Sequence, residues 1–552
     1  MTPRLRSVIG PLASILLLAP AASAQSEEPP PGPTVLQPAP TATTTAPPVV
    51  APPATHGSIV EFSSLRLMRD KGVITQAEYD SAMADIAPST GARAADATSL
   101  VVGKWSTTIY GFAETDLIND STQSFNDVAG NALVLRPNGI PYVPAAGVAP
   151  PPQNTYPANH GRTQMSVRNS RLGLQLRAPE THHVRVSGMV ETDFLGYEPA
   201  PSATTGPTES QFFTSPTLRL RHAVLKVETP VVDILIGQYW DLFGWQSVYQ
   251  PNSVQIQGLV GELYARDPQI RLSHTWKTHA IEVEVALAAR RPPSRDSQMP
   301  EGQGGVRLAF PWWTGIMTNG ATATNVMPAS IAVTGDVRQF SLPEFSQTPT
   351  RTVSLTTQAI AVDAFIPVIP KKRANEGNAL SLNGEIVTGS GISDLYTGLS
   401  YGLTFPYLPN TSSVENGNTG TNYTQDVDNG MVIYDTAGAL HGIQLTSFLA
   451  GLQYYLPGLG GHVWVSGNFA RTQSGNIATF TRPITVGTDS TKVQYAFDYT
   501  VRQAENFFDA NLFWDIVSGA RVGFEYANFN DQYVDGAHAI NNRFQFSGFF
   551  IF

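Results

Sequence analysis

The chain has 552 residues, no Cys, 47 Gly and 42 Pro, with a formal charge of -10 and a mean hydropathy of -0.10. This length allows a large core, but the hydropathy is too low for a bundle of membrane-spanning helices. The acidity argues against nucleic acid as a partner, and the absence of Cys excludes a disulfide framework and cysteine-based catalysis.

Residues 1–24 have the layout of a secretory signal peptide. A start that contains Arg precedes a short apolar core at residues 15–19, and Ala22–Ala24 supplies the small residues of a cleavage site. The apolar core is too short to cross a bilayer as a helix. We therefore expect export with cleavage after Ala24, and the loss of Arg4 and Arg6 changes the formal charge from -10 to -12.

Three short regions are predicted between the signal peptide and the main domain. Residues 25–56 are rich in Pro, Ala and Thr and form a linker that cannot build a core. Residues 57–88 combine apolar positions at helical spacing with a capping-box pattern at Thr75–Glu78, which predicts two short helices joined by a turn. A segment of this size cannot bury enough apolar surface alone, so we expect it to dock or self-associate in the periplasm. Residues 89–103 form a second linker.

From residue 104 to the end, helical spacing gives way to the alternation of half-buried strands. In residues 105–117 and 184–194, small and apolar side chains on one face oppose charged side chains on the other. The acids on these polar faces are Glu114, Asp116, Glu191 and Asp193. The other alternating segments, which bring the count to about 16, are 166–178, 217–228, 233–241, 269–276, 281–290, 304–310, 330–340, 352–365, 379–389, 441–456, 462–472, 504–516, 521–530 and 541–552.

The connections between these segments alternate between short and long. Residues 177–183 and 277–279 are tight turns, whereas residues 119–163, 243–268 and 405–440 are long and rich in Gly, Pro and Asn. Short turns at one end and long loops at the other are typical of a transmembrane up-and-down barrel whose long loops lie outside the cell. We therefore predict an all-β, antiparallel barrel over residues 104–552, with its apolar face toward outer-membrane lipid and the helix pair in the periplasm.

The last segment carries the signature of a barrel-closing strand. Four aromatic residues share its apolar face, namely Phe544, Phe546, Phe550 and Phe552. An apolar edge strand invites aggregation unless it is paired, so we expect it to pair with residues 105–117 and close the barrel. A terminal strand ending in Phe also resembles the sorting signal of outer-membrane barrels, which implies the barrel assembly machinery as a partner. The alternative is the last strand of a secreted β-sandwich.

Several arginines fall on the polar, lumen-facing side of the predicted strands. They are Arg171, Arg185, Arg219, Arg221, Arg271 and Arg290. In a narrow aqueous pore, such fixed positive charges attract carboxylates and phosphates without trapping them. The alternative is that they neutralise the inward acids and stiffen the wall.

The long connection after residue 243 supplies a second candidate feature, a constriction loop within the lumen, and its residues are Trp245, Gln246, Tyr249, Gln250 and Asn252. An exterior loop is the alternative.

Four strings in the first third of the barrel resemble the DcaP-like trimeric porins of Gram-negative outer membranes. They are SVRNSRLGLQLRAPE (166–180), SGMVETDFLG (187–196), RLRHAVLKVE (219–228) and IGQYWDLFGWQ (236–246). The resemblance implies a 16-stranded channel that forms a homotrimer, carries an amino-terminal periplasmic segment and prefers small anionic solutes such as dicarboxylates. Where that family has a long heptad coiled coil, this chain has a Pro-rich linker and a helix pair.

Motifs for other functions are weak. Gly398–Gly402 matches the nucleophile elbow of hydrolases, with Ser400 as nucleophile, but no helix pattern follows it. His182 and His183 lie in a predicted tight turn without a second pair at metal-ligand spacing. We therefore expect a passive porin without cofactor, metal or catalytic activity. The alternatives are an outer-membrane lipid or ester hydrolase, and a non-conducting adhesin or envelope anchor that acts through residues 58–86.

Overall fold

The computed structural model describes residues 99–102, 105–137, 155–196, 217–319, 321–346, 349–403, 427–435, 437–485, 493–497 and 500–552. Residues 86–552 form one compact unit. The predicted signal peptide, the Pro-rich linker and the helix pair lie outside the described residues. In the described ranges, no helix is long and apolar enough to cross a membrane.

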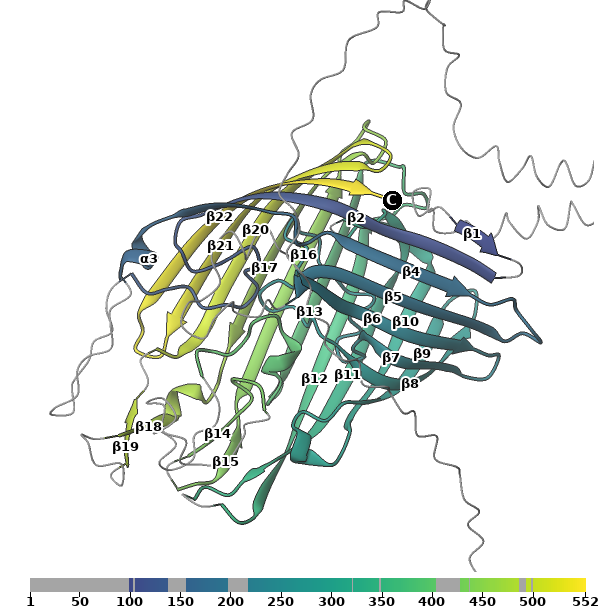
Figure 1. Ribbon diagram of the computed structural model, residues 1–552. Coiled ribbons are helices and arrows are strands. Elements are labelled where there is room, and N and C mark those ends of the chain that lie inside the picture. The colour runs from purple at the N-terminus through teal and green to yellow at the C-terminus, as the bar shows by residue number, and fades with distance from the viewer. Residues whose placement is uncertain are drawn as a thin grey trace, which may run out of the picture. The chain divides into compact units, whose positions relative to one another are not determined.

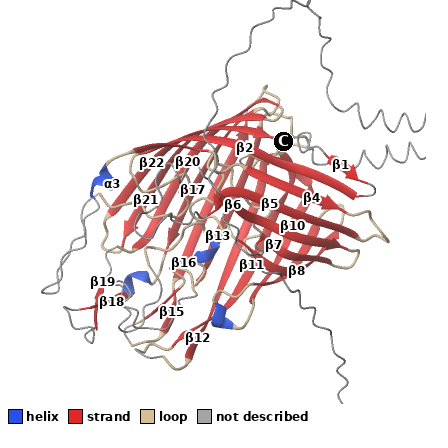
Figure 2. Cartoon of the chain, in the orientation of Figure 1, coloured by secondary structure: helices blue, strands red, loops and turns tan. Residues whose placement is uncertain are grey.

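The main sheet closes into an antiparallel barrel of 16 wall strands (Figures 1 and 2). The wall strands are β2 (Trp105–Asp120), β3 (Arg162–Ser166), β4 (Arg171–Arg177), β5 (Arg185–Gly196), β6 (Thr217–Glu228), β7 (Asp233–Trp240), β8 (Arg266–Lys277), β9 (Glu282–Arg290), β10 (Glu301–Met317), β11 (Asn325–Pro343), β12 (Thr352–Ile369), β13 (Ala379–Ser390), β16 (Gln444–Tyr455), β17 (Val463–Gln473), β20 (Arg502–Val517), β21 (Ala520–Tyr533) and β22 (His538–Ile551). The short β3 and β4 pair with successive halves of β2 and together form one wall strand.

The remaining elements are short and are not part of this ring of wall strands. They are β1 (Ser99–Val102), which pairs with β2, the pairs β14 (Val432–Tyr434) with β15 (Leu440–Gly442) and β18 (Thr481–Thr485) with β19 (Val493–Phe497), the helix α3 (Thr155–Asn159), and the 3-10 turns η1 (Arg295–Ser297), η2 (Ser393–Leu395) and η3 (Ile477–Thr479). Consecutive wall strands are neighbours in the sheet, so the predicted up-and-down barrel is confirmed.

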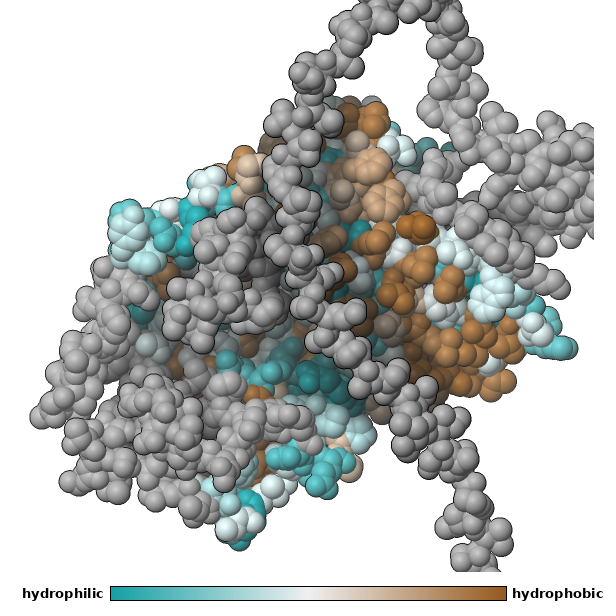
Figure 3. Space-filling model, viewed as in Figure 1, coloured by the Kyte–Doolittle hydropathy of each residue, from teal (hydrophilic) through white to brown (hydrophobic). Residues whose placement is uncertain are grey.

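The predicted inward and outward faces of the strands are also observed. On β2, Ile109 and Leu117 are exposed, whereas Glu114 and Asp116 between them are buried. On β22, Phe544 and Phe550 are exposed and Arg543 is buried. Exposed apolar side chains form a broad brown surface over β4 to β8 in Figure 3. Because strand side chains alternate between faces, one sequence pattern produces both the apolar exterior and the polar interior.

The barrel closes where its first and last strands pair. Nine residue pairs join β2 to β22, from Phe112 opposite Ile551 to Asp120 opposite Arg543. Inside this seam, Arg543 Nη2 lies 2.9 Å from the Asp120 carboxylate, and both side chains are fully buried. At the opposite end of the seam, Phe552 and Gly111 exchange two backbone hydrogen bonds of 3.0 Å. The predicted pairing of the two chain segments is thus confirmed.

The wall strands differ in length from the predicted segments in the middle of the chain. We expected a strand over residues 304–310, but β10 has 17 residues and its neighbours β11 and β12 have 19 and 18. The predicted segment stopped at Pro311 because proline has no N–H to donate to a neighbouring strand. In the structure the register with β11 shifts between Phe310 and Thr314, so the strand continues past Pro311 through a bulge.

Deletion of Phe552 is predicted to impair barrel assembly. The deletion removes both backbone hydrogen bonds with Gly111 and leaves the end of the seam unpaired. We expect a much smaller heat-modifiable, folded band when outer-membrane fractions are separated on detergent gels. Phe552→Tyr keeps the backbone and the aromatic ring, and it should assemble as the wild type does. Normal assembly of the deletion variant would contradict the role of this seam.

Candidate functional site

The connection between β7 and β8, residues 241–265, folds into the barrel, and we name it the inner loop. Its backbone N–H at Gly244 donates to Thr334 Oγ1 at 2.9 Å, and the N–H of Val254 donates to Asn511 Oδ1 at 3.0 Å. These acceptors lie on β11 and β20, far around the wall from β7. The inner loop therefore crosses the lumen.

The inner loop leaves β7 through a sharp turn. Gly244 and Trp245 have φ values of 77° and 42°, in the left-handed region that glycine adopts without strain. The turn sends the Trp245 side chain to the wall, where a Cβ atom at Gly305 would lie 2.8 Å from its ring. Gly523 on β21 makes the same room for Val254, since a Cβ there would lie 2.7 Å from Val254 Cγ2. Glycines that face inward thus let the loop lie against the wall.

Polar side chains of the wall hold the inner loop by its backbone and its amides. Asn252 Oδ1 accepts a 2.9 Å hydrogen bond from Trp464 Nε1, and Asn252 O accepts another of 2.9 Å from Ser466 Oγ. The Glu525 carboxylate accepts from Ser253 Oγ at 2.8 Å and from Gln255 N at 2.7 Å. Because these groups are buried, each lost hydrogen bond would leave an unsatisfied polar atom and cost about 1–3 kcal/mol.

All five residues predicted for a constriction loop lie on this inner loop. Trp245, Gln246, Tyr249 and Asn252 are buried and Gln250 is half-buried. Gln246 Oε1 accepts from Ala265 N at 2.6 Å, which ties the start of the loop to its end. Tyr249 OH donates to Ser330 Oγ at 2.9 Å. An exterior loop would face water, and this one packs against the lumen wall instead.

Apolar side chains from other loops fill part of the lumen. Phe243 and Leu263 of the inner loop belong to one buried cluster with side chains from residues 392–403. A second buried cluster joins Leu259 and Val260 to Phe125 of the β2–β3 connection and to inward side chains of β16, β17, β20 and β21. The lumen along those strands is therefore packed.

Two polar cavities flank the inner loop on the side of β2 to β10. The first, which we name the eyelet cavity, has a volume of about 40 Å³, and its lining includes Phe112, Arg171, Arg221, Trp240, Glu262 and Tyr264. The second has a volume of about 370 Å³ and is lined by Trp245, Lys226, Arg271, Glu284 and Arg307 among others. The eyelet cavity is the smaller of these two cavities.

Ion pairs across neighbouring strands line the eyelet cavity. Arg221 is fully buried, with Nε 2.7 Å from Glu191 and Nη1 3.0 Å from Asp193. Arg219 Nη2 lies 2.6 Å from the same Asp193. The structure thus brings Arg219 and Arg221 together with two of the predicted lumen acids, Glu191 and Asp193.

Two guanidiniums are incompletely paired: Arg171, which lines the eyelet cavity, and Arg266, which lies behind its lining residues Trp240 and Tyr264. Arg171 lies 3.5 Å from Glu191, but its Nε makes no hydrogen bond in the described part of the chain. Arg266 stacks on the rings of Trp240 and Tyr264, at 4.7 and 4.9 Å from their centroids, and its Nη1 is likewise without a hydrogen-bond partner among the described residues. Four guanidiniums therefore lie near three carboxylates, those of Glu191, Asp193 and Glu262, and the local charge is positive; burial raises the pKa of Glu262, which adds to the positive balance.

Arg266 was not among the predicted site residues. The predicted strand began at residue 269. On β8, side chains alternate so that Asp267, Gln269 and Arg271 are buried and face inward, and Arg266 does not belong to this inward-facing set. Its position depends on stacking between two aromatic rings from the ends of β7 and the inner loop. The only sequence signal is a pair of aromatic residues, Trp240 and Tyr264, that flank the loop.

The other predicted arginines lie elsewhere. Arg185 is largely exposed beside the β4–β5 turn, 3.7 Å from Glu228. Arg271 is buried and bonds Gln269 and the Trp240 carbonyl. Arg290 is buried in a separate network with Asp241, Glu301 and Asp394, at 2.8, 2.7 and 3.5 Å. These three do not join the eyelet cavity.

The predicted acids of β2 also lie apart from the arginine pairs. Asp116 accepts hydrogen bonds from Asn169 Nδ2 at 2.9 Å and from Gln545 Nε2 at 3.2 Å, next to the seam. Glu114 is buried, and its carboxylate oxygens make no hydrogen bond in the described ranges. Asp116 therefore contributes to closure of the barrel rather than to the eyelet.

Two loop residues have pKa values that follow from their surroundings. Burial raises the pKa of Asp394, but the guanidiniums of Arg338 and Arg290 lower it further, to about 2. This carboxylate stays ionised to strongly acidic pH and holds its loop to the wall. Burial likewise raises the pKa of Tyr264, but Arg221, Arg266 and Arg171 lower it, to about 8. The phenol of Tyr264 thus responds to the positive charge of the eyelet cavity.

The weak motifs have structural explanations. Ser400 Oγ accepts a 3.3 Å hydrogen bond from Gly402 N, and in the described ranges no histidine or carboxylate bonds to it. His182 and His183 form a two-residue hairpin turn with φ values of 51° and 62°, as the predicted polar turn requires. Among the described residues, no group of three or more histidines and acids is placed to hold a metal ion.

Glu525→Ala is predicted to release the inner loop. The substitution removes the acceptor of two hydrogen bonds to residues 253–255, and we expect larger and noisier single-channel currents in planar bilayers. Asn528→Ala, on the outward side of the same strand, is the matched control and should leave the currents unchanged. Currents of wild-type size and noise in Glu525→Ala would show that the inner loop does not border the conducting path.

The barrel is similar to the outer membrane channel DcaP of Acinetobacter baumannii, with a TM-score of 0.53 and 15% sequence identity over 83% of this chain and 100% of that chain. The anion-selective porin from Comamonas acidovorans (TM-score 0.41, 10% identity, 81% of this chain and 100% of that one) and OmpF of Salmonella typhi (0.42, 7%, 82% and 100%) also align. No protein-family model and no curated protein matches the sequence. The chain therefore has the 16-strand barrel fold of the DcaP channel, which confirms the predicted resemblance at the level of the fold.

Proposed function

We propose that the protein is an outer-membrane porin that lets small hydrophilic solutes diffuse passively, with a preference for anions of the dicarboxylate class. The apolar exterior of the barrel suits a bilayer, and its interior is lined by charged and polar side chains. The observation that carries the anion preference is the pair of incompletely bonded guanidiniums, Arg171 in the lining of the eyelet cavity and Arg266 behind that lining.

The charge balance of the eyelet cavity supports this preference. Glu191 and Asp193 are already engaged by Arg219 and Arg221. A carboxylate that enters the cavity can therefore pair with Arg266, which has no ion pair among the described residues, and with Arg171, whose contact with Glu191 is the longest in this cluster at 3.5 Å. Two carboxylates on one solute could engage both guanidiniums in turn. Since neither guanidinium can deprotonate at neutral pH, the attraction is permanent, and the narrow polar cavity discriminates against large solutes.

The other parts of the proposal concern the rest of the chain. Residues 1–24 direct export, residues 57–88 lie in the periplasm, and the barrels assemble as homotrimers in the outer membrane. The proposal includes no catalytic step: within the described residues no base bonds Ser400, whose hydroxyl accepts a hydrogen bond from Gly402 N in the local turn. Passage through the barrel is diffusion down a gradient rather than a chemical reaction.

Arg171→Gln and Arg266→Gln are predicted to reduce anion selectivity. Each variant removes one positive charge from the eyelet cavity, and we expect the chloride-to-potassium permeability ratio to fall several-fold for each and further for the double variant. The measurement is the reversal potential of purified protein in a planar bilayer under a salt gradient. Arg185→Gln removes a charge of the same kind at the turn end of the barrel and is the matched control. A wild-type cation preference would refute the proposed selectivity, and the absence of conductance would refute the porin function.

The anion preference is also predicted to fall as the pH rises through about 8. Below this value Tyr264 is a neutral phenol, and above it the phenolate adds a negative charge beside Arg221 and Arg266. The reversal potential should therefore shift toward cations between pH 7 and pH 9 by an amount that Tyr264→Phe abolishes. An identical pH dependence in wild type and Tyr264→Phe would show that another group titrates.

A further inference from the structure

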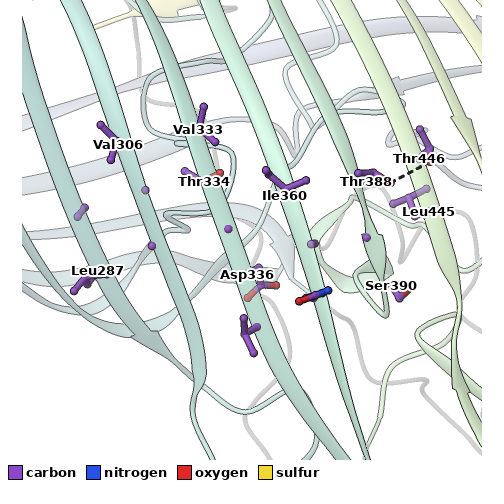
Figure 4. Close-up of a pocket in the computed structure, with 18 of the residues that line it drawn as sticks. Leu287, Val306, Val333, Thr334, Asp336, Ile360, Thr388, Ser390, Leu445 and Thr446 are labelled. Atoms are coloured by element: carbon purple, nitrogen blue, oxygen red, sulfur yellow. Dashed lines mark hydrogen bonds between the residues drawn. The ribbon is translucent and has the colours of Figure 1, made fainter.

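The end of the β10–β11 hairpin leaves the wall of the barrel. Along its first part β10 is an ordinary wall strand, and Figure 4 shows Val306 beside its register partner Val333 on β11, both exposed on the outside. Beyond the bulge in β10 this alternation stops, and residues 315–317 are buried one after another. A strand that is buried on both faces lies within the protein rather than in a lipid-facing wall. We name residues 314–319 and 321–328 the inturned hairpin.

The inturned hairpin packs against the inward faces of β12 and β13. Ser381 Oγ on β13 donates a 2.9 Å hydrogen bond to Ile316 O. A Cβ atom at Gly315 would lie 2.6 Å from Pro367 Cβ on β12 and 2.9 Å from Ser381 Oγ. Pro367 and Ser381 are both buried, so their side chains face the lumen. The bulge bends β10 inward, and the absence of a side chain at Gly315 lets the bent end lie against the wall.

The tip of the inturned hairpin is held by strands farther around the wall. Gln453 on β16 accepts a 3.0 Å hydrogen bond from Thr318 N and donates another of 3.0 Å to Thr318 O. The hydroxyls of Thr318 and Tyr455 lie 2.6 Å apart. On β21, Arg521 Nη1 donates to Thr322 O at 2.9 Å. Because several wall strands separate β16 and β21 from β11, the tip reaches across the lumen.

The inturned hairpin also lies against the inner loop. Ile316 and Met317 belong to two buried clusters that include side chains of the inner loop. At the tip, Asn319, Ala321 and Thr322 form part of the lining of the eyelet cavity. The eyelet cavity is therefore bordered by three parts of the molecule, which are the barrel wall, the inner loop and the inturned hairpin.

The inturned hairpin enters the lumen from the periplasmic end and carries no charge. Neighbouring strands run in opposite directions, so the β10–β11 connection lies at the same end of the barrel as the tight turn at residues 178–184. Short turns lie on the periplasmic side in barrels of this type. Residues 314–328 contain no Asp, Glu, Lys or Arg. The inturned hairpin can thus narrow the periplasmic exit of the eyelet cavity without changing its charge.

We propose that the inturned hairpin sets the largest solute that can pass through the barrel. The inference rests on the proposed porin function and separates two determinants of passage, since pore diameter and lining charge act independently. The guanidiniums near the eyelet cavity select the charge of the solute, and the uncharged hairpin limits its size. Thr322 is exposed at the tip and is the residue that a leaving solute passes.

A single introduced thiol tests whether the tip borders the conducting path. The chain has no Cys, so only the new thiol of Thr322→Cys reacts with N-ethylmaleimide, which adds bulk without charge. For the full-length protein in planar bilayers, we expect the single-channel current to fall several-fold on modification while the reversal potential stays unchanged. Thr181→Cys adds an exposed thiol to another turn at the same end, and modification of this matched control should leave the current unchanged. Mass spectrometry shows whether each thiol has reacted.

Release of the tip tests the size limit itself. Gln453→Ala combined with Tyr455→Phe removes the side-chain hydrogen bonds that hold Thr318 to β16. In liposome swelling, we expect the rate for a trisaccharide relative to that for a pentose to rise several-fold, with an unchanged reversal potential. Gln444→Ala combined with Tyr454→Phe changes the same residue types on the outward side of β16 and should behave as the wild type. Both double variants should keep the folded, heat-modifiable band.

The results that overturn the inference differ from those that overturn the porin function. A thiol in Thr322→Cys that does not react in the folded protein, or reacts without a change in current, would place the tip away from the conducting path. An unchanged trisaccharide rate in the release variant would show that the size limit lies elsewhere. A reversal potential that shifts on modification would show that the hairpin acts on charge. These outcomes leave the porin function intact, whereas a wild-type protein without conductance would refute both.

Discussion

Every backbone N–H and C=O group in a bilayer must find its partner within the protein, because lipid offers none. In this chain that requirement is met only when β22 pairs with β2, since all the other wall strands are paired by neighbours in sequence. The seam therefore combines three layers of contact: the backbone ladder, the buried pair of Arg543 with Asp120, and the terminal hydrogen bonds of Phe552 with Gly111. Because this seam closes the wall, it fixes the positions of the inner loop in the lumen and of the apolar side chains on the exterior.

Closure creates an interior that is wide enough to need filling, and the chain fills it with its own loops. The inner loop spans from β7 to β11, β17, β20 and β21, and it is held by buried acceptors such as Glu525 and Asn511. Inward glycines at Gly305 and Gly523 let it approach the wall. The consequence is a lumen that is packed by the inner loop and other loops along β12 to β21, where buried polar groups of the wall hold them, and that contains the two described cavities along β2 to β10.

Charge is distributed unevenly between the region of these cavities and the rest of the lumen. Most buried arginines are compensated: Arg290 and Arg338 share Glu301 and Asp394, and Arg502 contacts Glu505 and Asp531. Such networks stiffen the wall and anchor loops, because breaking a buried pair leaves an uncompensated charge at a cost of about 3–5 kcal/mol. Arg266 differs in having no ion pair among the described residues, and Arg171 differs in that its one described ion pair, with Glu191, is long at 3.5 Å. The structure thus shows the neutralising role that was one alternative at the level of sequence, and the anion-attracting role stays a prediction.

Periodicity alone determined the number of wall strands, their outward and inward faces and the pairing of the last strand with the first, because side chains alternate by a strict period of two and outward positions must be apolar. The position and the polar and aromatic content of residues 243–268 predicted the loop that lies in the lumen, and of the six predicted arginines Arg171, Arg219 and Arg221 lie together beside it. Tertiary structure decided which of those arginines are neutralised, since Arg290 and Arg221 find their carboxylates on other strands or loops, at distances along the chain that no local pattern encodes. The same holds for Arg266, whose place depends on two aromatic rings brought together by the inner loop.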